Sequence, residues 1–292
     1  MGAPYSVKQI DTSLTRIVSP KGRVYDLPFK GFTVDRTAMD QAIVTQATEE
    51  GATFKTDVTV TNVKGTKVET TKGVFEAKLI VGADGPMSSV AKTIGFEHPV
   101  AAPAMSASIV GDFSDITEMH FGNVAPGGYA WVIPKGKSAN VGVGVWPRYK
   151  GNLKLLYDAF LRKLGLPQTR ATGGYVPLEG PISRTVKGNV ILVGDAAGHV
   201  MPPNGGGINV AMICGRIAGE TIADYMEGNV PLEEYERRWR EVVGGPLYQG
   251  LKTRRLADHF FGSERLLEAA MLFLGSKRMG RAIRCKGLFL GK

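Results

Sequence analysis

The chain has 292 residues, enough for two domains of ordinary size, and 43% of them are hydrophobic. This composition is typical of a globular protein with a substantial core, and no stretch reaches the roughly 18 apolar residues needed to span a bilayer. Two cysteines, Cys214 and Cys285, exclude a disulfide framework and favour a reducing compartment, and the N-terminus shows no secretory signal. We therefore predict a cytoplasmic protein.

The net charge of +9 is concentrated near the C-terminus. Residues 252–292 contain ten basic and three acidic residues, which gives this segment a net charge of +7. Two interpretations stay open: a solvated tail, or a basic amphipathic segment that makes peripheral contact with the inner face of the membrane. Nucleic acid fits less well, because aromatic residues are not interleaved with the basic ones as stacking platforms.

Alternating helical and strand patterns follow one another along the chain from residue 33. Residues 33–51 predict a helix that Asp35 caps and Gly51 ends. Short runs rich in Val and Thr, separated by Lys-Gly pairs, then predict hairpin strands. The expected strands are 53–63, 66–71, 73–77, 78–83 and 189–193, with a mainly β region at 104–147; the further helices are 152–165, 207–226 and most of 231–292.

The strongest functional signal is a buried strand that ends just before Asp195 and leads, about ten residues later, to Gly205, Gly206 and Gly207 at a helix start. A carboxylate at the end of a strand can hydrogen-bond a sugar-like hydroxyl, and glycines let the backbone approach a flat ring or a phosphate. The following helix directs its free N–H groups and positive dipole end at that ligand. The pattern favours a ligand with a pyrophosphate over a plain strand–turn–helix connection.

This segment resembles the second FAD motif of the flavoprotein superfamily that contains the aromatic hydroxylases and the geranylgeranyl reductases. The resemblance implies that Asp195 holds the ribityl chain of FAD. It also implies that the amides of Gly207 and Ile208 lie by the pyrophosphate and the flavin. His199 stands where the family often has His, although by itself it is more typical of a packed or solvent-facing residue than of a catalyst.

Two earlier segments extend the resemblance. Residues 82–90 are similar to the family's Gly-Ala-Asp-Gly fingerprint, in which Asp84 orders the strand ends around the pyrophosphate; an ordinary β-turn is the alternative. The Val-Asp-Arg sequence that ends at Arg36 resembles a segment whose Arg contacts FAD, and a surface arginine is the alternative. By spacing within the same family, Val60 falls where a backbone group contacts the adenine end.

A fourth segment, residues 126–134, resembles the one that lines the substrate cavity of geranylgeranyl reductases, with Ile133 in place of the family's Phe. Strand alternation puts Tyr129, Trp131 and Ile133 on one face. Together with Pro134 they are expected to form an apolar wall for a prenyl chain. An ordinary core strand is the alternative.

The resemblance implies an α/β protein with a glutathione-reductase-like FAD-binding fold, as in para-hydroxybenzoate hydroxylase. The expected domains are an FAD-binding domain at 1–100 and 181–235, a β-sheet substrate domain at 101–180 and a helical segment at 236–292. The family's first βαβ unit, with its Gly-x-Gly-x-x-Gly sequence, is not found in the chain. A mis-set start codon, a split gene and a truncated flavoprotein all stay open as explanations.

The activity implied by the resemblance is FAD-dependent reduction of carbon–carbon double bonds in geranylgeranyl chains of archaeal-type membrane lipids. An electron donor such as reduced nicotinamide or ferredoxin would be needed. Neither a catalytic residue nor a metal site is predicted. One alternative is an FAD-dependent aromatic or quinone-linked monooxygenase, which would consume oxygen. Another is a truncated remnant that binds prenyl lipid without catalysis.

Overall fold

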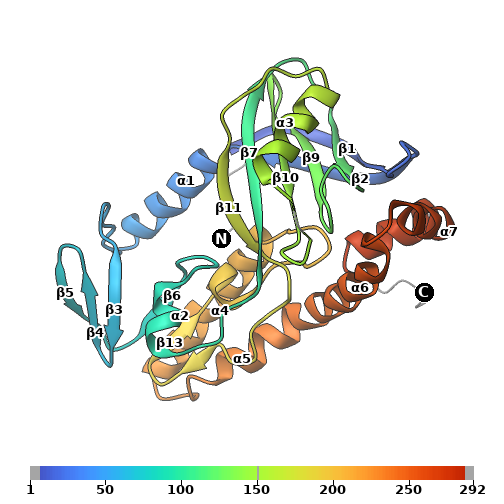
Figure 1. Ribbon diagram of the computed structural model, residues 1–292. Helices are drawn as coiled ribbons and strands as arrows, with labels where there is room; N and C mark the ends of the chain where they lie inside the picture. The colour runs from blue at the N-terminus through green and yellow to red at the C-terminus, as the bar shows by residue number, and fades with distance from the viewer. Residues whose placement is uncertain (1–6, 150, 287–292) are drawn as a thin grey trace. The chain divides into compact units, whose positions relative to one another are not determined.

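The computed structural model describes residues 7–149 and 151–286, which form two compact units (Figure 1). The first unit comprises Met1–Asp57, Pro103–Gly174 and Phe260–Lys277; the second comprises Val58–Ala102, Tyr175–His259 and Arg278–Lys292. Lys292, counted above among the basic residues of the C-terminal segment, lies outside the described residues. The predicted cofactor and substrate domains are functional assignments, and their boundaries stay predictions.

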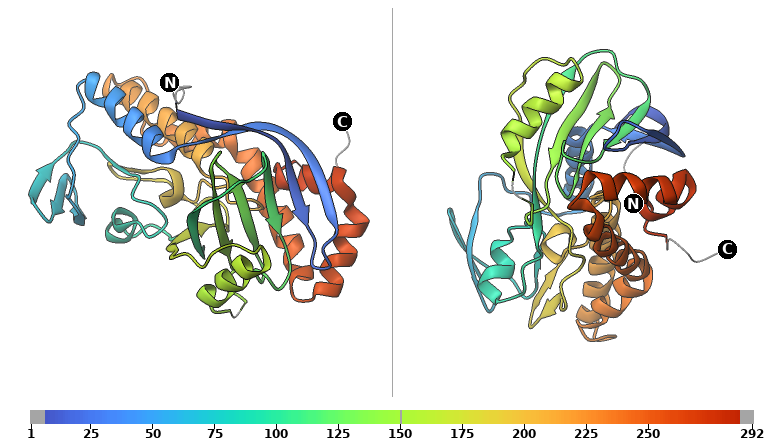
Figure 2. Two further views of the ribbon diagram at one scale, coloured as in Figure 1. Left: turned by 90° about the horizontal axis from the view of Figure 1, so that it is seen from above. Right: turned by 45° about the vertical axis from the view of Figure 1, so that its right-hand side comes forward.

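The first unit is built on a seven-stranded sheet in the order β11-β7-β10-β9-β8-β1-β2. Its elements are β1 (Lys8–Val18), β2 (Val24–Val34), α1 (Arg36–Glu49), β7 (Ala101–Val110), β8 (Ile116–His120), β9 (Tyr129–Pro134), β10 (Ser138–Gly144), α3 (Leu153–Lys163), β11 (Thr172–Pro177) and most of α7 (Glu264–Ile283). Figure 2 shows α3 lying against this sheet. The β-rich region expected at 104–147 and the helix expected at 152–165 are thereby confirmed.

Helix α3 packs on the sheet through large side chains that meet small ones. Tyr157, Phe160 and Leu161 are fully buried in one cluster with Ala130 and Val132 of β9. These two strand residues alternate with the half-buried ones, so they share the face that α3 covers. The opposite face of β9 therefore carries Tyr129, Trp131 and Ile133.

The long hairpin of β1 and β2 was not among the sequence predictions. The two strands pair antiparallel, with Val18 opposite Val24, and β1 also pairs parallel with β8, with Leu14 opposite Ile116. The parallel partner lies about a hundred residues away in the chain. Pairing at that separation gives no local signal, and turn residues around 20–22 are the only nearby mark of the hairpin.

Helix α1 begins and ends close to where the sequence predicts. The Asp35 carboxylate caps it by accepting a hydrogen bond from the Ala38 amide at 3.0 Å. Gly51 follows its last turn with φ +95°, a backbone conformation that glycine adopts without strain. The predicted helix at 33–51 is therefore confirmed, shortened at its first residues because β2 continues to Val34.

Helix α7 is tied to the β1–β2 turn by a buried carboxylate. Glu268 is only 6% exposed; it accepts a hydrogen bond from the Lys21 amide at 3.0 Å and pairs with the Arg23 guanidinium at 3.1 Å. Burial by itself raises the pKa of Glu268, but hydrogen bonds from Ser19 and Lys21 and the charge of Arg23 hold the pKa below its ordinary value. The carboxylate therefore stays charged at neutral pH.

The second unit contains two small three-stranded sheets and the remaining helices. Its elements are β3 (Val60–Lys64), β4 (Lys67–Thr70), β5 (Gly73–Glu76), β6 (Ile80–Gly82), α2 (Ser89–Ile94), β12 (Val186–Lys187), β13 (Val190–Leu192), the 3-10 helix η2 (Gly194–Ala197), α4 (Ile208–Met226), α5 (Glu234–Trp239), the π-helix η3 (Arg240–Gly244) and α6 (Gly245–Phe261). One sheet has the order β12-β13-β6 and the other β3-β4-β5. The strands and helices expected in this part of the chain are found close to their predicted positions, except that the strand expected at 53–63 begins only at Val60.

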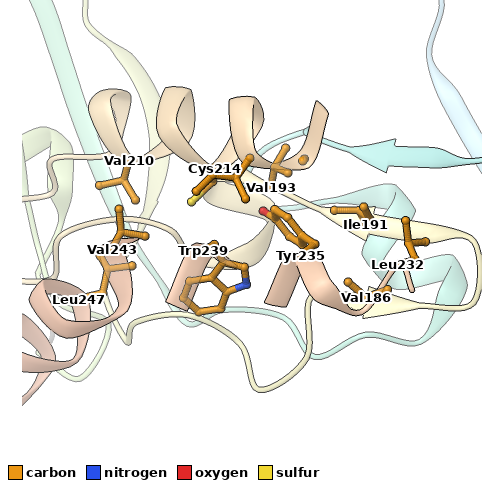
Figure 3. Close-up of a cluster of buried hydrophobic side chains, with 12 residues drawn as sticks. Val186, Ile191, Val193, Val210, Cys214, Leu232, Tyr235, Trp239, Val243 and Leu247 are labelled. Atoms are coloured by element: carbon orange, nitrogen blue, oxygen red, sulfur yellow. The ribbon is translucent and has the colours of Figure 1, made fainter. Parts of the chain in front are cut away.

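The core of the second unit lies between β13, α4 and α5, where Tyr235 and Trp239 fill the centre (Figure 3). Each buried ring finds a partner for its polar atom: the Tyr235 hydroxyl donates to the Leu192 carbonyl at 3.3 Å, and the Trp239 indole N–H donates to the Thr185 hydroxyl at 3.0 Å. Cys214 joins this cluster, and burial raises its pKa to about 12. Both thiols of the chain are buried and free.

Within residues 7–149 and 151–286, no helix is both long and apolar enough to cross a bilayer. Helix α7 spans 20 residues, but Gly275 interrupts it with φ 61° and ψ 174°, which divides it into two shorter segments.

We expect Glu268→Gln to lower the free energy of unfolding near neutral pH by roughly 1–3 kcal/mol, because charge-assisted hydrogen bonds to a buried group are lost. The folded pKa lies below the unfolded value of about 4.5, so the carboxylate's contribution is complete above that pH and disappears as the pH falls through the folded pKa. The gap between the urea midpoints of the variant and the unchanged protein should narrow accordingly in acid.

The exposed Glu49 at the end of α1 supplies the matched control, because Glu49→Gln removes a charge without removing a buried partner. An equal loss of unfolding free energy in the two variants would contradict this account. So would a difference in urea midpoint between Glu268→Gln and the unchanged protein that stays the same as the pH falls.

Candidate functional site

Two parallel strands of the second unit deliver the predicted aspartates to one edge of their sheet. β6 and β13 run parallel, with Ile80 opposite Val190, and the Val193 amide donates to the Gly82 carbonyl at 3.0 Å. Asp84 and Asp195 each follow the carboxyl end of one of these strands. In open α/β sheets this is the edge at which ligands bind.

Asp195 is partly exposed, whereas every other residue from 190 to 200 is buried. Its neighbour Gly194 has φ 61°, a backbone conformation that favours glycine. A Cβ at Gly194 would lie 3.4 Å from Ala211 of α4, which is an ordinary contact distance. The turn therefore lies directly beside the helix, and Asp195 is its one partly exposed residue between 190 and 200.

The start of α4 lies directly beside that carboxylate. A Cβ added to Gly207 would lie 3.1 Å from Oδ1 of Asp195 and 3.2 Å from Val200, so only glycine allows this approach without displacement. Gly207 is the N-cap of α4 and has no side chain with which to cap the helix, and a helix N-terminus is a place where anionic groups are stabilised. Ile208, the first helical residue, is 39% exposed. The structure therefore brings together three residues that the sequence assigns to one motif.

The glycine loop before α4 is closed by its own hydrogen bonds. The Met201 amide donates to the Gly206 carbonyl at 3.1 Å, and the Gly206 amide donates to the Asn204 side chain at 2.7 Å. Gly205 has φ +67°, which favours glycine. Asn204 was not singled out from the sequence, although Asn before a run of glycines is a recognisable turn signal.

The carboxylate of Asp84 accepts hydrogen bonds from its own turn. It accepts a hydrogen bond from the Ser88 hydroxyl at 2.5 Å and one from the Val90 amide at 3.1 Å, which fixes the start of α2. These bonds order the turn itself, and the role around a pyrophosphate that the resemblance implies for Asp84 stays a prediction. Val60 begins β3 and packs against the hydrophobic cluster of this unit, and its predicted contact with adenine stays a prediction.

Arg36 belongs to the first unit. It stands in the first turn of α1, its side chain is 51% exposed, and it pairs with Asp40 at 3.3 Å. This is the geometry of an ordinary helix-surface pair, which contributes little to stability. A contact between Arg36 and a cofactor stays a prediction.

The aromatic strand β9 separates the four predicted substrate residues. Tyr129, Trp131 and Ile133 are half-buried on one face, whereas Pro134 is buried and alternates onto the α3 side with Val132. Burial raises the pKa of Tyr129 to about 12, so its phenol is neutral at any physiological pH. We call the face formed by Tyr129, Trp131 and the aliphatic Ile133 the β9 aromatic face.

Neighbouring rings extend the β9 aromatic face. Tyr129 meets Trp131 edge-on with ring centroids 5.9 Å apart, and Phe121 lies 5.8 Å from Tyr129. Phe121 in turn stacks on Phe261 at 6.4 Å. Contacts of these kinds add roughly 0.5–1.5 kcal/mol per pair beyond simple burial. The row of rings is therefore a rigid apolar surface.

His199 is a packed residue, as its context favoured. It is fully buried, and its ring lies 4.6 Å from the ring of Trp239. Burial, together with the charge of Arg240, lowers the pKa of His199 to about 3, so the imidazole is neutral. It therefore does not carry the imidazolium proton that a histidine acid would donate at neutral pH.

Residues 104–175 match the model of the geranylgeranyl reductase catalytic domain. The chain is 34% identical to digeranylgeranylglycerophospholipid reductase 2 of Methanothermobacter thermautotrophicus, over 81% of this chain and 67% of that protein. It is 31% identical to the digeranylgeranylglycerophospholipid reductase of Methanocaldococcus jannaschii, over 90% of this chain and 74% of that protein.

Solved structures share the fold. A geranylgeranyl bacteriochlorophyll reductase-like protein of Thermoplasma acidophilum superposes with a TM-score of 0.77 at 22% identity, over 99% of this chain and 79% of that chain. A flavin-dependent brominase superposes with a TM-score of 0.69 at 17% identity, over 96% of this chain and 78% of that chain. The predicted α/β flavoprotein fold is thereby confirmed.

Proposed function

The chain belongs to the digeranylgeranylglycerophospholipid reductase family, and we propose that it reduces isolated carbon–carbon double bonds in geranylgeranyl chains of membrane lipids. The observation that carries this proposal is the β9 aromatic face, because it lies within the residues 104–175 that match the reductase catalytic domain. A prenyl chain is flexible and apolar, and a rigid row of aromatic rings is a surface that can orient it and keep water away from the alkene.

We propose FAD as the cofactor. Three features support it: the partly exposed Asp195 at the end of a strand, the absence of a side chain at Gly207 beside its carboxylate, and the N-terminus of α4 at the same place. A carboxylate suits a sugar-like hydroxyl, and helix amides suit a pyrophosphate. Bound in its reduced form, FAD supplies the hydride that an isolated alkene requires. The chain's own contribution is to hold the cofactor and to orient the lipid.

The monooxygenase alternative has less support. The family match and the similar proteins with 30% identity or more carry reductase names, whereas the halogenase- and oxygenase-type proteins share the fold at 17% identity or less. At that identity a common fold carries no information about the reaction. The non-catalytic alternative likewise has no observation in its favour.

The reaction itself is tested without oxygen. We expect the full chain, supplied with FAD, dithionite and a geranylgeranylated glycerophospholipid, to give products heavier by two hydrogens for each reduced bond, as measured by mass spectrometry. Turnover that requires oxygen would favour the monooxygenase, and a flavin-loaded chain that leaves the lipid unchanged without oxygen would contradict the proposed reductase activity.

The cofactor site is tested by Asp195→Ala. Loss of a charge-assisted hydrogen bond is worth roughly 1.5–3 kcal/mol, so we expect the affinity for FAD to fall about ten- to a hundredfold. Titration of flavin fluorescence against the chain measures this change. Glu220→Ala is the matched control, because it removes an exposed carboxylate of the same unit from the middle of α4. Equal affinities for the two variants would refute the assignment of Asp195.

We also propose that α7 contacts the lipid surface from which the substrate comes. One side of the helix is buried through Leu267 and Met271. The other side exposes Leu266, Leu272 and Phe273 by 54%, 55% and 72%, respectively. These three define the α7 outer face. A helix of a water-soluble surface normally carries polar side chains there.

Positive charge flanks the α7 outer face. Arg265 and Lys277 are exposed near its two ends, and the C-terminal segment as a whole has a net charge of +7. Each basic residue near an anionic membrane contributes about 1 kcal/mol, and salt screens it within roughly 10 Å. Apolar side chains next to such charges are typical of helices that lie in the membrane interface.

Sedimentation with phosphatidylglycerol vesicles tests this contact. We expect binding at low salt that weakens as the ionic strength rises, and we expect Leu272→Gln together with Phe273→Gln to reduce it severalfold, because the inserted apolar area is lost. Val110→Gln is the control, since Val110 is 84% exposed on β7, far from α7 in the sequence. Absence of binding at low salt, or an equal loss in the control, would rule out the α7 outer face as a membrane contact.

A further inference from the structure

We propose that Asn140 of β10 is a positioning residue that fixes the indole of Trp131 and hides its N–H group, so that the prenyl chain meets a purely apolar ring. This inference rests on the proposed function, because it assigns the β9 aromatic face to a prenyl chain. It adds a residue that no sequence motif of the chain marks.

The contact between the two side chains is short and directional. The indole N–H of Trp131 donates to Oδ1 of Asn140 at 2.7 Å, and the Asn140 amide donates to the Ser106 hydroxyl at 3.3 Å. The indole N–H can only donate, so the amide oxygen must face it, and the NH₂ group is left to face Ser106. The orientation of the Asn140 side chain is therefore determined by chemistry at both ends.

The strand beneath the ring is shaped to receive it. Gly142 stands opposite Trp131 in the β9–β10 register, and a Cβ at Gly142 would overlap the six-membered ring of the indole. At the next position on that face, Gly144, a Cβ would lie 3.6 Å from the same ring, which is ordinary contact. The indole thus lies across the glycine backbone of β10, held at its nitrogen by Asn140 and at its edge by Tyr129.

An unpaired N–H group would make this ring a poor wall for a hydrocarbon. A donor that is buried without an acceptor loses its hydrogen bonds to water and gains none in return. A donor that already has an acceptor in the protein does not incur this cost. On the half-buried face of β9, the Trp131 N–H would lose water whenever a prenyl chain covered it. Asn140 removes that penalty in advance and holds the ring in one orientation before the lipid arrives.

The proposal is tested by the kinetics of four variants of the full chain loaded with FAD: Asn140→Leu, Asn140→Asp, Trp131→Phe and the double variant that combines Trp131→Phe with Asn140→Leu. Asn140→Leu should raise KM for a geranylgeranylated lipid roughly tenfold, equivalent to about 1.4 kcal/mol, with little change in kcat. Asn140→Asp keeps an acceptor oxygen and should restore most of the lost affinity. In a Trp131→Phe background there is no N–H to hide, so Asn140→Leu should add nothing further.

A second readout does not depend on turnover. The difference between the fluorescence of the full chain and that of Trp131→Phe isolates the emission of Trp131, and Asn140→Leu should increase its quenching by acrylamide, because the ring is released. Thermal melts of each variant show whether the sheet is intact.

The outcomes separate the two hypotheses. If the unchanged protein reduces no prenyl lipid, the proposed function fails, whereas unchanged quenching in Asn140→Leu overturns the positioning role by itself. If Asn140→Leu costs the same in the unchanged chain and in the Trp131→Phe background, Asn140 acts through the stability of the sheet and the proposal is wrong.

Discussion

The close contact between the carboxylate of Asp195 and the start of α4 is the constraint on which the second unit depends. Gly207 permits it, since a Cβ there would lie 3.1 Å from the carboxylate oxygen. The same helix, a few residues later, buries Cys214 and Ile217 against Tyr235 and Trp239. Because one helix makes both contacts, the packing of the core fixes the position of Asp195 and Gly207 relative to each other. If FAD binds here as proposed, its affinity and the stability of this unit would be coupled through one rigid helix.

In the first unit, the two faces of β9 carry side chains of different size. On the α3 side, β9 supplies the small residues Ala130 and Val132, and the helix supplies the large rings of Tyr157 and Phe160. The large residues of the strand are thereby left for the opposite face, where Trp131 spreads over the glycine backbone of β10. Strand alternation thus places a well-packed core on one side of a single strand and the half-buried β9 aromatic face on the other.

Local chemistry made much of this architecture predictable. The cap at Asp35, the strand before Asp195 and the glycines before α4 each produce their structure through near neighbours in the chain, so the sequence shows them. The alternation of β9 likewise revealed which of its residues share a face, although the burial of Pro134 on the other side shows that a motif can span both.

Contacts between distant segments could not be predicted in the same way. The pairing of β1 with β8 depends on a register between Leu14 and Ile116 that neither segment encodes alone. Asn140 lies on a different strand from the motif that contains Trp131, and its role becomes visible only when the β9–β10 register is known. The contacts that such residues make depend on which residues face them on the neighbouring strand. A single sequence without a structure does not show this pairing.

The burial of both thiols has a practical consequence for spectroscopy. Cys214 and Cys285 are free and enclosed, and burial raises their pKa values to about 12 and about 11, so almost none of the reactive thiolate is present near neutral pH. Maleimide and nitroxide reagents should therefore leave the native chain unmodified under mild conditions. A cysteine introduced on an exposed helix of each unit would then carry a probe selectively, and the native residues would not need to be replaced first.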